Sequence, residues 1–352
     1  MSPRPSRRLS YAASGVNIAK ADKTKEAMAK TLKSTDKRVL NSVGSWAFAS
    51  LFDARFPGYD HPVLVLKTEE PGSKQLLAFR HGRIESICQD MINHLINDIA
   101  VMGATPMSVQ DAVICGKLEK DIVTRIVKAI ADACRAQGCV LTGGETSEQP
   151  GTLKPGTYVL TASVVGIVEK ANVIDGSKIK PGDVVMAVAS NGLHTNGYSL
   201  VRALLKKHPK LAKQKVGARS FLDAILLPHT SYFRALEPLF THPGLAGMAH
   251  ITGSGIRGNL ERVLPAKTDA VIDLHNLKTL PVFTAIRDAG HVSDAEMLRT
   301  YNMGVGLVIV ARPDAVDDIE THLWSYGHHC YPIGRIVKGK RTVKFEGTVK
   351  WA

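Results

Sequence analysis

Stretches with the apolar pattern of β-strands alternate with stretches that have the period of α-helices, and this alternation constrains the fold more than any other feature. In the first half it predicts strands at 63–67 (buried), 107–114, 140–142 and 158–168, and helices at 84–102 and 121–137. In the second half it predicts strands at 184–189, 270–274, 304–311 and finally 331–337, and helices at 198–207, 231–240, 259–263, 282–290 and 314–326. Such alternation in both halves is typical of α/β or α+β domains.

The length of the chain indicates more than one domain. Its 352 residues exceed the size of about 250–300 residues at which a single hydrophobic core stops growing. We expect a boundary near 170–176, after which the turn-rich segment 178–183 introduces a new strand. The chain is therefore divided into an N-terminal extension at 1–20, mobile at its start, and two domains at 21–170 and 171–352.

The composition narrows the class of protein. No stretch approaches the ~18 apolar residues that a membrane span needs, and the Arg-rich N-terminus lacks the apolar run of a secretory signal. The five cysteines are odd in number and form no C-x-x-C motif, which predicts buried thiols rather than disulfides or a zinc site. These features predict a cytoplasmic protein without a membrane partner.

A formal net charge of +13 raises the hypothesis of a nucleic-acid partner. The charge is concentrated in residues 1–40, with ten Lys/Arg against three acids, and in residues 202–219, with seven Lys/Arg and no acid. Neither run has the interleaved aromatic residues of a single-strand binding surface, and we expect residues 20–38 to form a solvated arm. Because phosphorylated small molecules explain a basic bias equally well, nucleic acid is the weaker hypothesis.

The segment S-N-G-L-H-T-N-G-Y-S-L-V-R at 190–202 leads from a predicted strand into a predicted helix. Such a loop presents free backbone N–H groups and the positive end of a helix dipole to an anion. Its His194, Asn196 and Ser199 can orient a ligand. The alternative is an ordinary capped turn, since Gly-rich turns are common. T-G-S-G at 252–255, within a predicted Gly-rich loop at 251–258, is a second candidate anion loop.

Two segments offer carboxylates for a metal ion. Asp98 lies near the end of a predicted helix, in apolar surroundings where an unpaired carboxylate is costly, so we favour a functional role over a surface one. Asp90, about two turns earlier, is a weaker candidate. Glu145 follows Gly143 and Gly144 after a predicted short strand, where flexible residues can place an acid beside Mg²⁺.

The segment T-E-E-P-G-S-K at 68–74 also follows a predicted strand, and it ends in a hydroxyl and a lysine. It is not a P-loop, because G-x-x-x-x-G-K-[ST] is absent. The alternative for this segment is a surface hairpin. Arg299, which precedes another predicted strand, can pair with a phosphate or with a surface acid.

Together these segments resemble the phosphoribosylformylglycinamidine cyclo-ligase (aminoimidazole ribonucleotide synthetase) family. The matching segments occur in the family's order: Y-A-A-S-G-V-N-I (11–18), N-D-I-A-V-M-G-A-T-P (97–106), G-K-L (116–118), G-G-E-T-S-E-Q-P-G (143–151), V-G-I-V-E-K-A-N-V-I-D-G-S-K (165–178), the segment at 190–202, H-I-T-G-S-G-I (250–256) and R-T-Y-N-M-G-V-G (299–306). Only ten residues precede the first segment, which is too few for a usual organellar presequence.

The resemblance implies a two-domain aminoimidazole ribonucleotide synthetase-like fold, in which the N-terminal domains of a homodimer pair into a β-barrel. It implies that ATP phosphorylates the formyl oxygen of formylglycinamidine ribonucleotide and that ring closure then yields aminoimidazole ribonucleotide, in de novo purine biosynthesis. The N-terminal domain would bind ATP and Mg²⁺ and dimerise. The C-terminal domain would contribute loops that bind the phosphorylated substrate.

The resemblance also implies roles for individual residues. Lys74, Asp98 and His194 would be catalytic, and Glu69, Asp98 and Glu145 would bind the metal ion. The ATP- and phosphate-binding set would be Thr68, Glu69, Ser73, Lys74, Asn97, Gly143, Gly144, Glu145 and Thr146. The substrate-binding set would be Asn191, Gly192, His194, Asn196, Ser199, Thr252, Gly253, Ser254 and Gly255.

The chain departs from the family's pattern on the nucleotide side. The family's T-D-G-V-G-T-K is T-E-E-P-G-S-K at 68–74, and its Gly-rich segment is V-G-S-W-A-F-A at 43–49. A third difference replaces a triple glycine by Gly253-Ser254-Gly255. These changes raise an alternative, a divergent paralogue that binds a phosphorylated ligand with altered or no ATP turnover. Related ATP enzymes, such as selenophosphate or glycinamidine synthetases, are further alternatives, although the match at 165–202 favours the cyclo-ligase.

Overall fold

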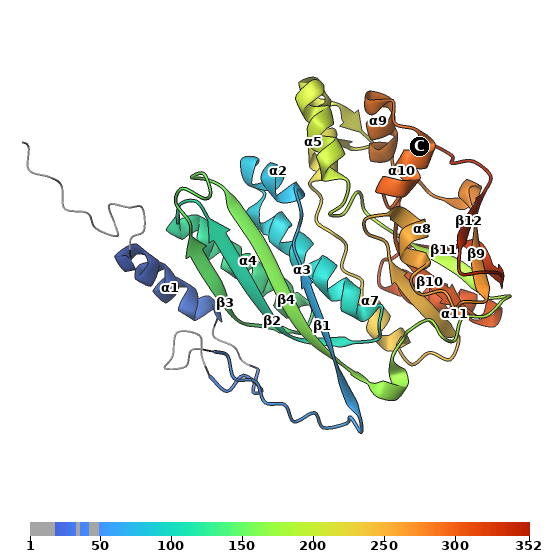
Figure 1. Ribbon diagram of the computed structural model, residues 1–352, viewed down its shortest axis with the longest axis horizontal. Coiled ribbons are helices and arrows are strands. Elements are labelled where there is room, and N and C mark those ends of the chain that lie inside the picture. The colour runs from blue at the N-terminus through green and yellow to red at the C-terminus, as the bar shows by residue number, and fades with distance from the viewer. Residues whose placement is uncertain (1–17, 33–35, 42–48) are drawn as a thin grey trace, which may run out of the picture.

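The computed structural model describes residues 18–32, 36–41 and 49–352, so the N-terminal extension up to residue 17 and most of the segment 43–49 lie outside the described residues. Two β-sheets lie side by side, one in each half of the chain (Figure 1). The first half contains α1 (Ile18–Leu32), β1 (Pro62–Glu69), α2 (Lys74–Arg80), α3 (Ile84–Ala100), β2 (Thr105–Cys115), α4 (Lys120–Ala136), β3 (Val140–Glu148) and β4 (Tyr158–Glu169).

The second half follows a short 3₁₀ helix, η1 (Lys170–Asn172). Its strands are β5 (Val184–Ala189), β6 (Lys215–Val216), β7 (Arg219–Ser220), β8 (Leu245–His250), β9 (Thr268–Asp273), β10 (Val305–Ala311), β11 (Cys330–Lys338) and β12 (Val343–Glu346). Its helices are α5 (Tyr198–Lys207), α6 (Phe221–Ile225), α7 (Phe233–Leu236), α8 (Gly255–Leu260), α9 (Pro281–Gly290), α10 (Asp294–Thr300) and α11 (Val316–Ser325), with short 3₁₀ helices η2 (Pro209–Lys213), η3 (Glu237–Leu239), η4 (Leu274–Asn276) and η5 (Pro313–Ala315).

The N-terminal sheet has the strand order β1-β4-β2-β3, in which only the β2–β3 pair is parallel. Helices α3 and α4 pack on one face of this sheet (Figure 1). Helix α3 forms where apolar residues recur with helical spacing, and its Ile87, Met91, Leu95 and Ile99 are fully buried. The helix therefore has its apolar stripe against the sheet, and its remaining faces are available to contact the C-terminal half.

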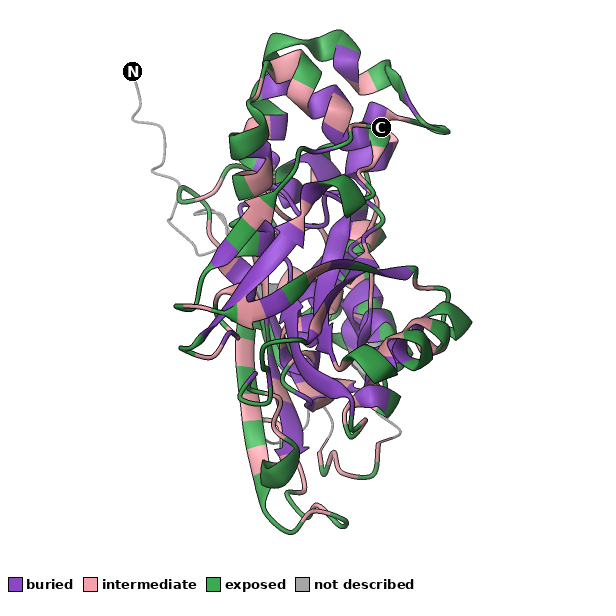
Figure 2. Cartoon of the chain, turned by 90° about the vertical axis from the view of Figure 1, so that its right-hand side faces the viewer, coloured by how far each residue is buried: buried purple, intermediate pink, exposed green. Residues whose placement is uncertain are grey.

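The C-terminal sheet has the order β12-β9-β11-β5-β10-β8. Every residue of β10 is buried, because β10 lies inside the sheet and is covered on both faces. Figure 2 shows that buried residues gather in the strands, whereas exposed residues lie on the loops and on the outer faces of the helices. The expectation of a mixed α/β chain with two domain-sized halves agrees with this arrangement, and no helix among the described residues is both long and apolar enough to span a bilayer.

Several predicted elements need correction. The expected solvated arm at 20–38 is largely helix α1, which packs on α4 through Met28. The expected short strand 140–142 continues as β3 to Glu148, because β2 pairs with it throughout. The segment 68–74 is no hairpin, since it leads from β1 into α2. The predicted helix at 259–263 begins four residues earlier, at Gly255, and β12 follows the strand that was expected to be last.

Two further predictions were wrong in extent or burial. The helix predicted at 231–240 is only the short α7 followed by η3, because Pro238 interrupts the helical hydrogen bonds. The strand predicted at 63–67 is not buried. As an edge strand, β1 leaves Leu64 52% and Leu66 71% exposed on one face.

Candidate functional site

The two halves of the chain are joined along α3. The segment between α6 and α7 lies on this helix and exchanges hydrogen bonds with its polar side chains. Asn97 donates to Thr230 O at 2.8 Å and accepts from Tyr232 N at 3.0 Å, while Asp90 accepts from His229 N at 2.7 Å. Asn97 is fully buried, and its amide holds the two halves together; its predicted contact with a nucleotide stays a prediction.

Lys74 is a fully buried cation at the same junction. Its Nζ donates to Asp90 Oδ1 at 2.8 Å, to His194 O at 3.0 Å and to Leu227 O at 2.6 Å. These contacts use all three N–H groups of the ammonium. That Lys74 neutralises a phosphate stays a prediction, and in this structure Lys74 connects α2 and α3 to two loops of the C-terminal half.

Two predicted metal ligands do meet. Glu69, at the end of β1, and Asp98, on α3, both contact Lys67: its Nζ lies 3.0 Å from Glu69 Oε2 and 3.0 Å from Asp98 Oδ2. His94 lies one helical turn before Asp98, with Nε2 3.7 Å from Glu69 Oε2 and 3.9 Å from Asp98 Oδ2. Two carboxylates thus converge on one cation.

A chain of polar contacts runs from Asp98 into the C-terminal half. His250 Nδ1 lies 2.6 Å from Asp98 Oδ1, and the Nε2 atoms of His250 and His229 are 2.9 Å apart. Thr195 Oγ1 then lies 3.5 Å from His229 Nδ1 and 2.9 Å from His94 Nδ1. This series of contacts therefore starts at Asp98 on α3 and ends at His94 on the same helix.

Burial and neighbouring charges shift the pKa values of the histidines and of Asp98 in this series of contacts. Burial, followed by the positive charge of His250, lowers the pKa of His94 to about 4, and burial lowers the pKa values of His194 and His229 well below their usual range. Burial acts to raise the pKa of Asp98, but the hydrogen bond from His250 and the nearby cations hold it well below its usual range. At pH 7 these imidazoles are therefore neutral, and Asp98 is ionised.

The two candidate anion loops lie next to each other. Asn196 Oδ1 is 3.3 Å from the point where a Cβ on Gly253 would lie. Among the predicted substrate-binding residues, Asn191, Ser199, Gly253 and Ser254 are exposed, Asn196 and Thr252 are half-buried, and Gly192, His194 and Gly255 are buried. The expectation that His194 faces the substrate stays a prediction; in this structure its buried ring stacks on His229 with centroids 3.8 Å apart.

Glu145 does not join Glu69 and Asp98. Glu69 pairs with Ala162 on β4, which pairs with Asp111 on β2, which in turn pairs with Gly144 on β3. Three strand spacings separate Glu69 from the Gly143–Thr146 segment within one chain, a distance of about 14 Å. The predicted metal set is therefore divided between the two edges of the N-terminal sheet, and a single ion cannot contact all three acids of one chain.

The remaining predicted nucleotide residues lie on β1 and just after it. Thr68 Oγ1 is 2.8 Å from Ser163 Oγ, and Ser73 immediately precedes α2. Gly72 has a left-handed backbone, and a Cβ there would lie 3.7 Å from Thr195 O. The loop between β1 and α2 thus runs over the loop that follows β5.

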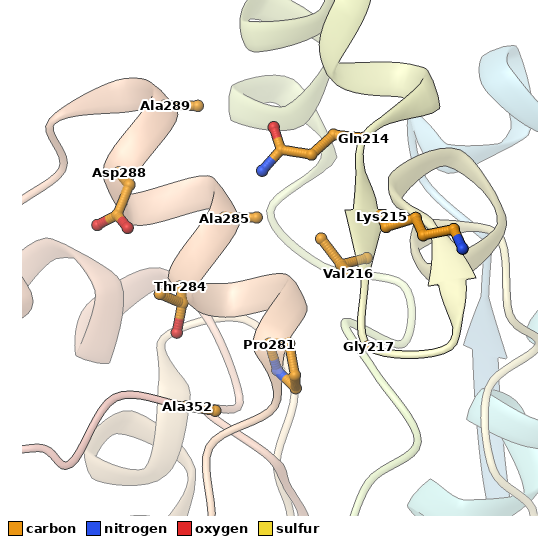
Figure 3. Close-up of a pocket in the computed structure, with 10 residues that line it drawn as sticks. All are labelled: Gln214, Lys215, Val216, Gly217, Pro281, Thr284, Ala285, Asp288, Ala289 and Ala352. Carbon is orange, nitrogen blue, oxygen red and sulfur yellow. The ribbon is translucent and has the colours of Figure 1, made fainter.

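A separate surface pocket of about 440 Å³ lies between β6 and α9 (Figure 3). Its lining includes Lys215, Val216, Pro281 and Asp288, and no residue of either predicted set. We therefore place the candidate site at Glu69, Asp98 and the histidines, where charged groups converge.

Sequence reasoning missed Lys67, His94 and His229 as members of the site, and it quoted Thr195 and His250 within matching segments without assigning either a role. Only His94 carried a local signal, because it is four residues before Asp98 on a predicted helix. The others are brought together by pairing and packing of segments distant in the chain, which no local pattern records.

Comparisons with known proteins identify relatives along the whole chain. Residues 58–168 match the family described as "AIR synthase related protein, N-terminal domain", and residues 180–345 match "AIR synthase related protein, C-terminal domain". The chain is 38% identical over 329 residues to a phosphoribosylformylglycinamidine cyclo-ligase from Nitrosospira multiformis, covering 93% of each sequence.

Two solved structures show the same fold at low sequence identity. A thiamine-monophosphate kinase from Stenotrophomonas maltophilia aligns with a TM-score of 0.64 and 17% identity, over 96% of this chain and 98% of the other. The hydrogenase maturation protein HypE in complex with ATP aligns with a TM-score of 0.64 and 15% identity, over 94% and 92%.

Proposed function

The chain belongs to the AIR synthase related family, and from this premise we propose that it catalyses the ATP-dependent closure of formylglycinamidine ribonucleotide to aminoimidazole ribonucleotide, a step of purine biosynthesis. The observation that carries the proposal is the similarity to a cyclo-ligase over 93% of both sequences. No observation favours the alternative of a paralogue that binds without turnover.

In this reaction ATP transfers a phosphoryl group to the formyl oxygen, a substrate nitrogen attacks the activated carbon, and phosphate leaves. Because ATP supplies the activation, the protein needs no nucleophilic side chain, and its task is positioning and charge neutralisation. The solved relative that holds ATP supports ATP as the phosphoryl donor.

We place Mg²⁺ at Glu69 and Asp98. The fit rests on two carboxylate oxygens that converge on a single cation, the Lys67 ammonium, at 3.0 Å each. Hard carboxylate oxygens are suitable ligands for Mg²⁺, which neutralises phosphate charge when bound with ATP. The hydrogen bond from His250 fixes the orientation of the Asp98 carboxylate. Glu145 lies too far from this pair within one chain to complete the same ion's shell.

We place the phosphorylated substrate at the adjoining loops 190–197 and 252–255. The exposed Asn191 and Ser254 supply polar side chains there, Ser199 adds a hydroxyl from the first turn of α5, and Gly253 leaves backbone accessible. Asn191 already donates to Pro228 O at 2.8 Å, which fixes the loop that follows β5.

We further propose a homodimer in which the N-terminal sheets pair into a β-barrel. Leu64 and Leu66 support it, because they lie on the same face of edge strand β1 and are largely exposed in one chain. The five buried free cysteines suit a reducing compartment, so we place the enzyme in the cytoplasm.

The test of the activity is incubation with formylglycinamidine ribonucleotide, ATP and Mg²⁺, with ADP and aminoimidazole ribonucleotide followed separately. We expect both products in equal amounts and no ADP without the ribonucleotide. ADP formation that is independent of the substrate, or no aminoimidazole product at high enzyme concentration, would contradict the proposal.

The site is tested with Glu69→Gln and Asp98→Asn, which should each lower kcat by at least about 100-fold, the scale lost with one charge-stabilising group. Glu85→Gln is the matched control, because Glu85 is an exposed acid on the same helix as Asp98 that pairs with Arg125. Wild-type turnover in both site variants would refute the assignment of the two carboxylates.

A further inference from the structure

Three histidines of the C-terminal half gather at the junction with α3. One ring nitrogen of each of His194, His229 and His250 lies within 4.8 Å of the other two. The rings of His194 and His229 stack with centroids 3.8 Å apart, and the Nε2 atoms of His229 and His250 are 2.9 Å apart. The proposed reaction gives no role to His194 or His229, although each is 1% exposed.

The hydrogen bonds indicate which nitrogens have free lone pairs. A carboxylate only accepts, so the 2.6 Å contact with Asp98 Oδ1 places a proton on His250 Nδ1, and in the neutral form of His250 the lone pair is then on Nε2. His194 Nε2 lies 3.4 Å from Thr230 Oγ1, while its Nδ1 is buried with no hydrogen-bond partner. A buried polar nitrogen without a partner is uncommon, and this one is free to accept a ligand.

We propose that His194, His229 and His250 form a binding site for one transition-metal ion of the Zn²⁺, Co²⁺ or Ni²⁺ class. Imidazole nitrogens suit these ions, whereas Mg²⁺ prefers the carboxylate oxygens assigned above, so the two sites are chemically distinct. Asp98 acts as the orienting carboxylate behind a histidine ligand, an arrangement common at zinc sites.

The spacing suits such an ion after small side-chain rotations. Ligand nitrogens at about 2.0–2.1 Å from a tetrahedral Zn²⁺ lie about 3.3 Å from one another. The His229 and His250 nitrogens, 2.9 Å apart, are slightly closer than this distance. The ligand nitrogens of all three histidines lie within 4.8 Å of one another, so the largest separation that this allows exceeds the ideal distance by about 1.5 Å. Burial keeps His194 and His229 neutral at pH 7, the state in which imidazole binds a metal.

The backbone of each ligand is anchored independently of the ion. His194 has a left-handed φ of 58°, and its carbonyl accepts from Lys74. The His229 N–H donates to Asp90, and His250 ends β8 in register with Leu307. An ion therefore enters a site whose main chain is already in place, which lowers the entropic cost of binding.

The experiment uses the full-length protein freed of metal with a chelator, without nucleotide or substrate. It is titrated with Zn²⁺ by calorimetry and with Co²⁺ by visible absorption. We expect one equivalent to bind, with the ligand-field bands of a low-coordinate Co²⁺ ion, and excess Mg²⁺ should not displace it. A Zn²⁺-dependent rise in Tm would show that the folded state binds the ion.

The variants His194→Asn and His229→Asn should each weaken Zn²⁺ binding by more than about 100-fold, because losing only an orienting partner already costs about 10–100-fold. His328→Asn, outside the cluster, is the matched control and should bind as the wild type does. Circular dichroism of the metal-free variants checks folding.

A second set, His94, Asp98 and His250, offers the alternative location. Loss of binding in His94→Asn with full binding in His229→Asn would overturn the proposal. Absence of saturable binding to the wild type would also overturn it. Neither result depends on cyclo-ligase activity, so the proposal can fail while the proposed function stands.

Discussion

Replacing Lys74 by methionine tests whether a buried ion pair holds the two halves of the chain together. Lys74 and Asp90 have no exposed side-chain surface, and the ammonium also donates to the carbonyls of His194 and Leu227. Methionine fills a similar volume but removes the charge and all three donors. The Asp90 carboxylate then keeps the His229 N–H as a donor but loses its counter-ion.

The magnitude follows from the desolvation of Asp90. Removing one partner of a buried ion pair costs about 3–5 kcal/mol, because the other charge stays buried without compensation. Burial raises the pKa of Asp90 to about 6 even with Lys74 present, and losing the lysine raises it further. A carboxyl whose pKa is higher in the folded than in the unfolded state favours folding as the pH falls, so the cost should shrink between pH 8 and pH 5.

Urea unfolding at fixed protein concentration measures the effect. Lys74→Met should lose about 3–5 kcal/mol at pH 8. Lys74→Met with Asp90→Leu should recover part of that loss, because the uncompensated carboxylate is removed, while the carbonyls of His194 and Leu227 and the His229 N–H still lose their side-chain partners. Lys128→Met is the control: it breaks an exposed pair with Asp132 and should cost about 0.5 kcal/mol or less. A loss below about 1 kcal/mol at pH 8, or a loss independent of pH, would refute the reasoning.

Three further predictions follow from single positions. Ser254 has a left-handed φ of 76°, so Ser254→Gly should raise the free energy of unfolding by about 0.5–1 kcal/mol in thermal melts; a lower Tm would contradict this. Burial raises the pKa of Asp111 to about 7, above its unfolded value, so stability gains about 2–3 kcal/mol as the pH falls from 8 to 5, and Asp111→Asn should abolish that gain in urea titrations. Leu66→Asp charges the exposed face of β1 and should shift the proposed dimer to monomer in sedimentation; unchanged mass would argue against that interface.

The fold was most predictable where local pattern and tertiary environment agree. The strand at 184–189 and the helix at 198–207 have the predicted bounds. A short buried apolar run favours a strand and an amphipathic helical period favours a helix, so each pattern indicates one type of secondary structure. The strand at 140–142 was predicted too short, since Gly143 and Gly144 have no strand propensity and become strand only by pairing with β2. The burial of Val63–Lys67 was misjudged because the apolar run cannot tell an edge strand from a central one.

Asp98 was the part of the site that sequence could locate. An acid among Ile96, Ile99 and other buried residues needs a compensating partner, and the structure supplies Lys67 and His250. The partners themselves could not be predicted, because the packing of α3 on β1 brings Lys67 to Asp98 within the N-terminal half, and the packing of the two halves brings His250 there. The surroundings of Lys74 could not be predicted either, because a lysine after a loop has the same local pattern whether it faces a phosphate or a buried aspartate.

The change from aspartate to glutamate at position 69 bears on how the nucleotide side works. A longer side chain could have moved the acid away from Asp98, yet Glu69 Oε2 and Asp98 Oδ2 lie at the same 3.0 Å from the Lys67 ammonium. The extra methylene is therefore absorbed without separating the two carboxylates. Two negative charges and one positive charge leave a net negative site, so a divalent cation is still attracted when it replaces the ammonium between them. Position 69 thus keeps the electrostatic condition that the proposed binding of Mg²⁺ with ATP requires.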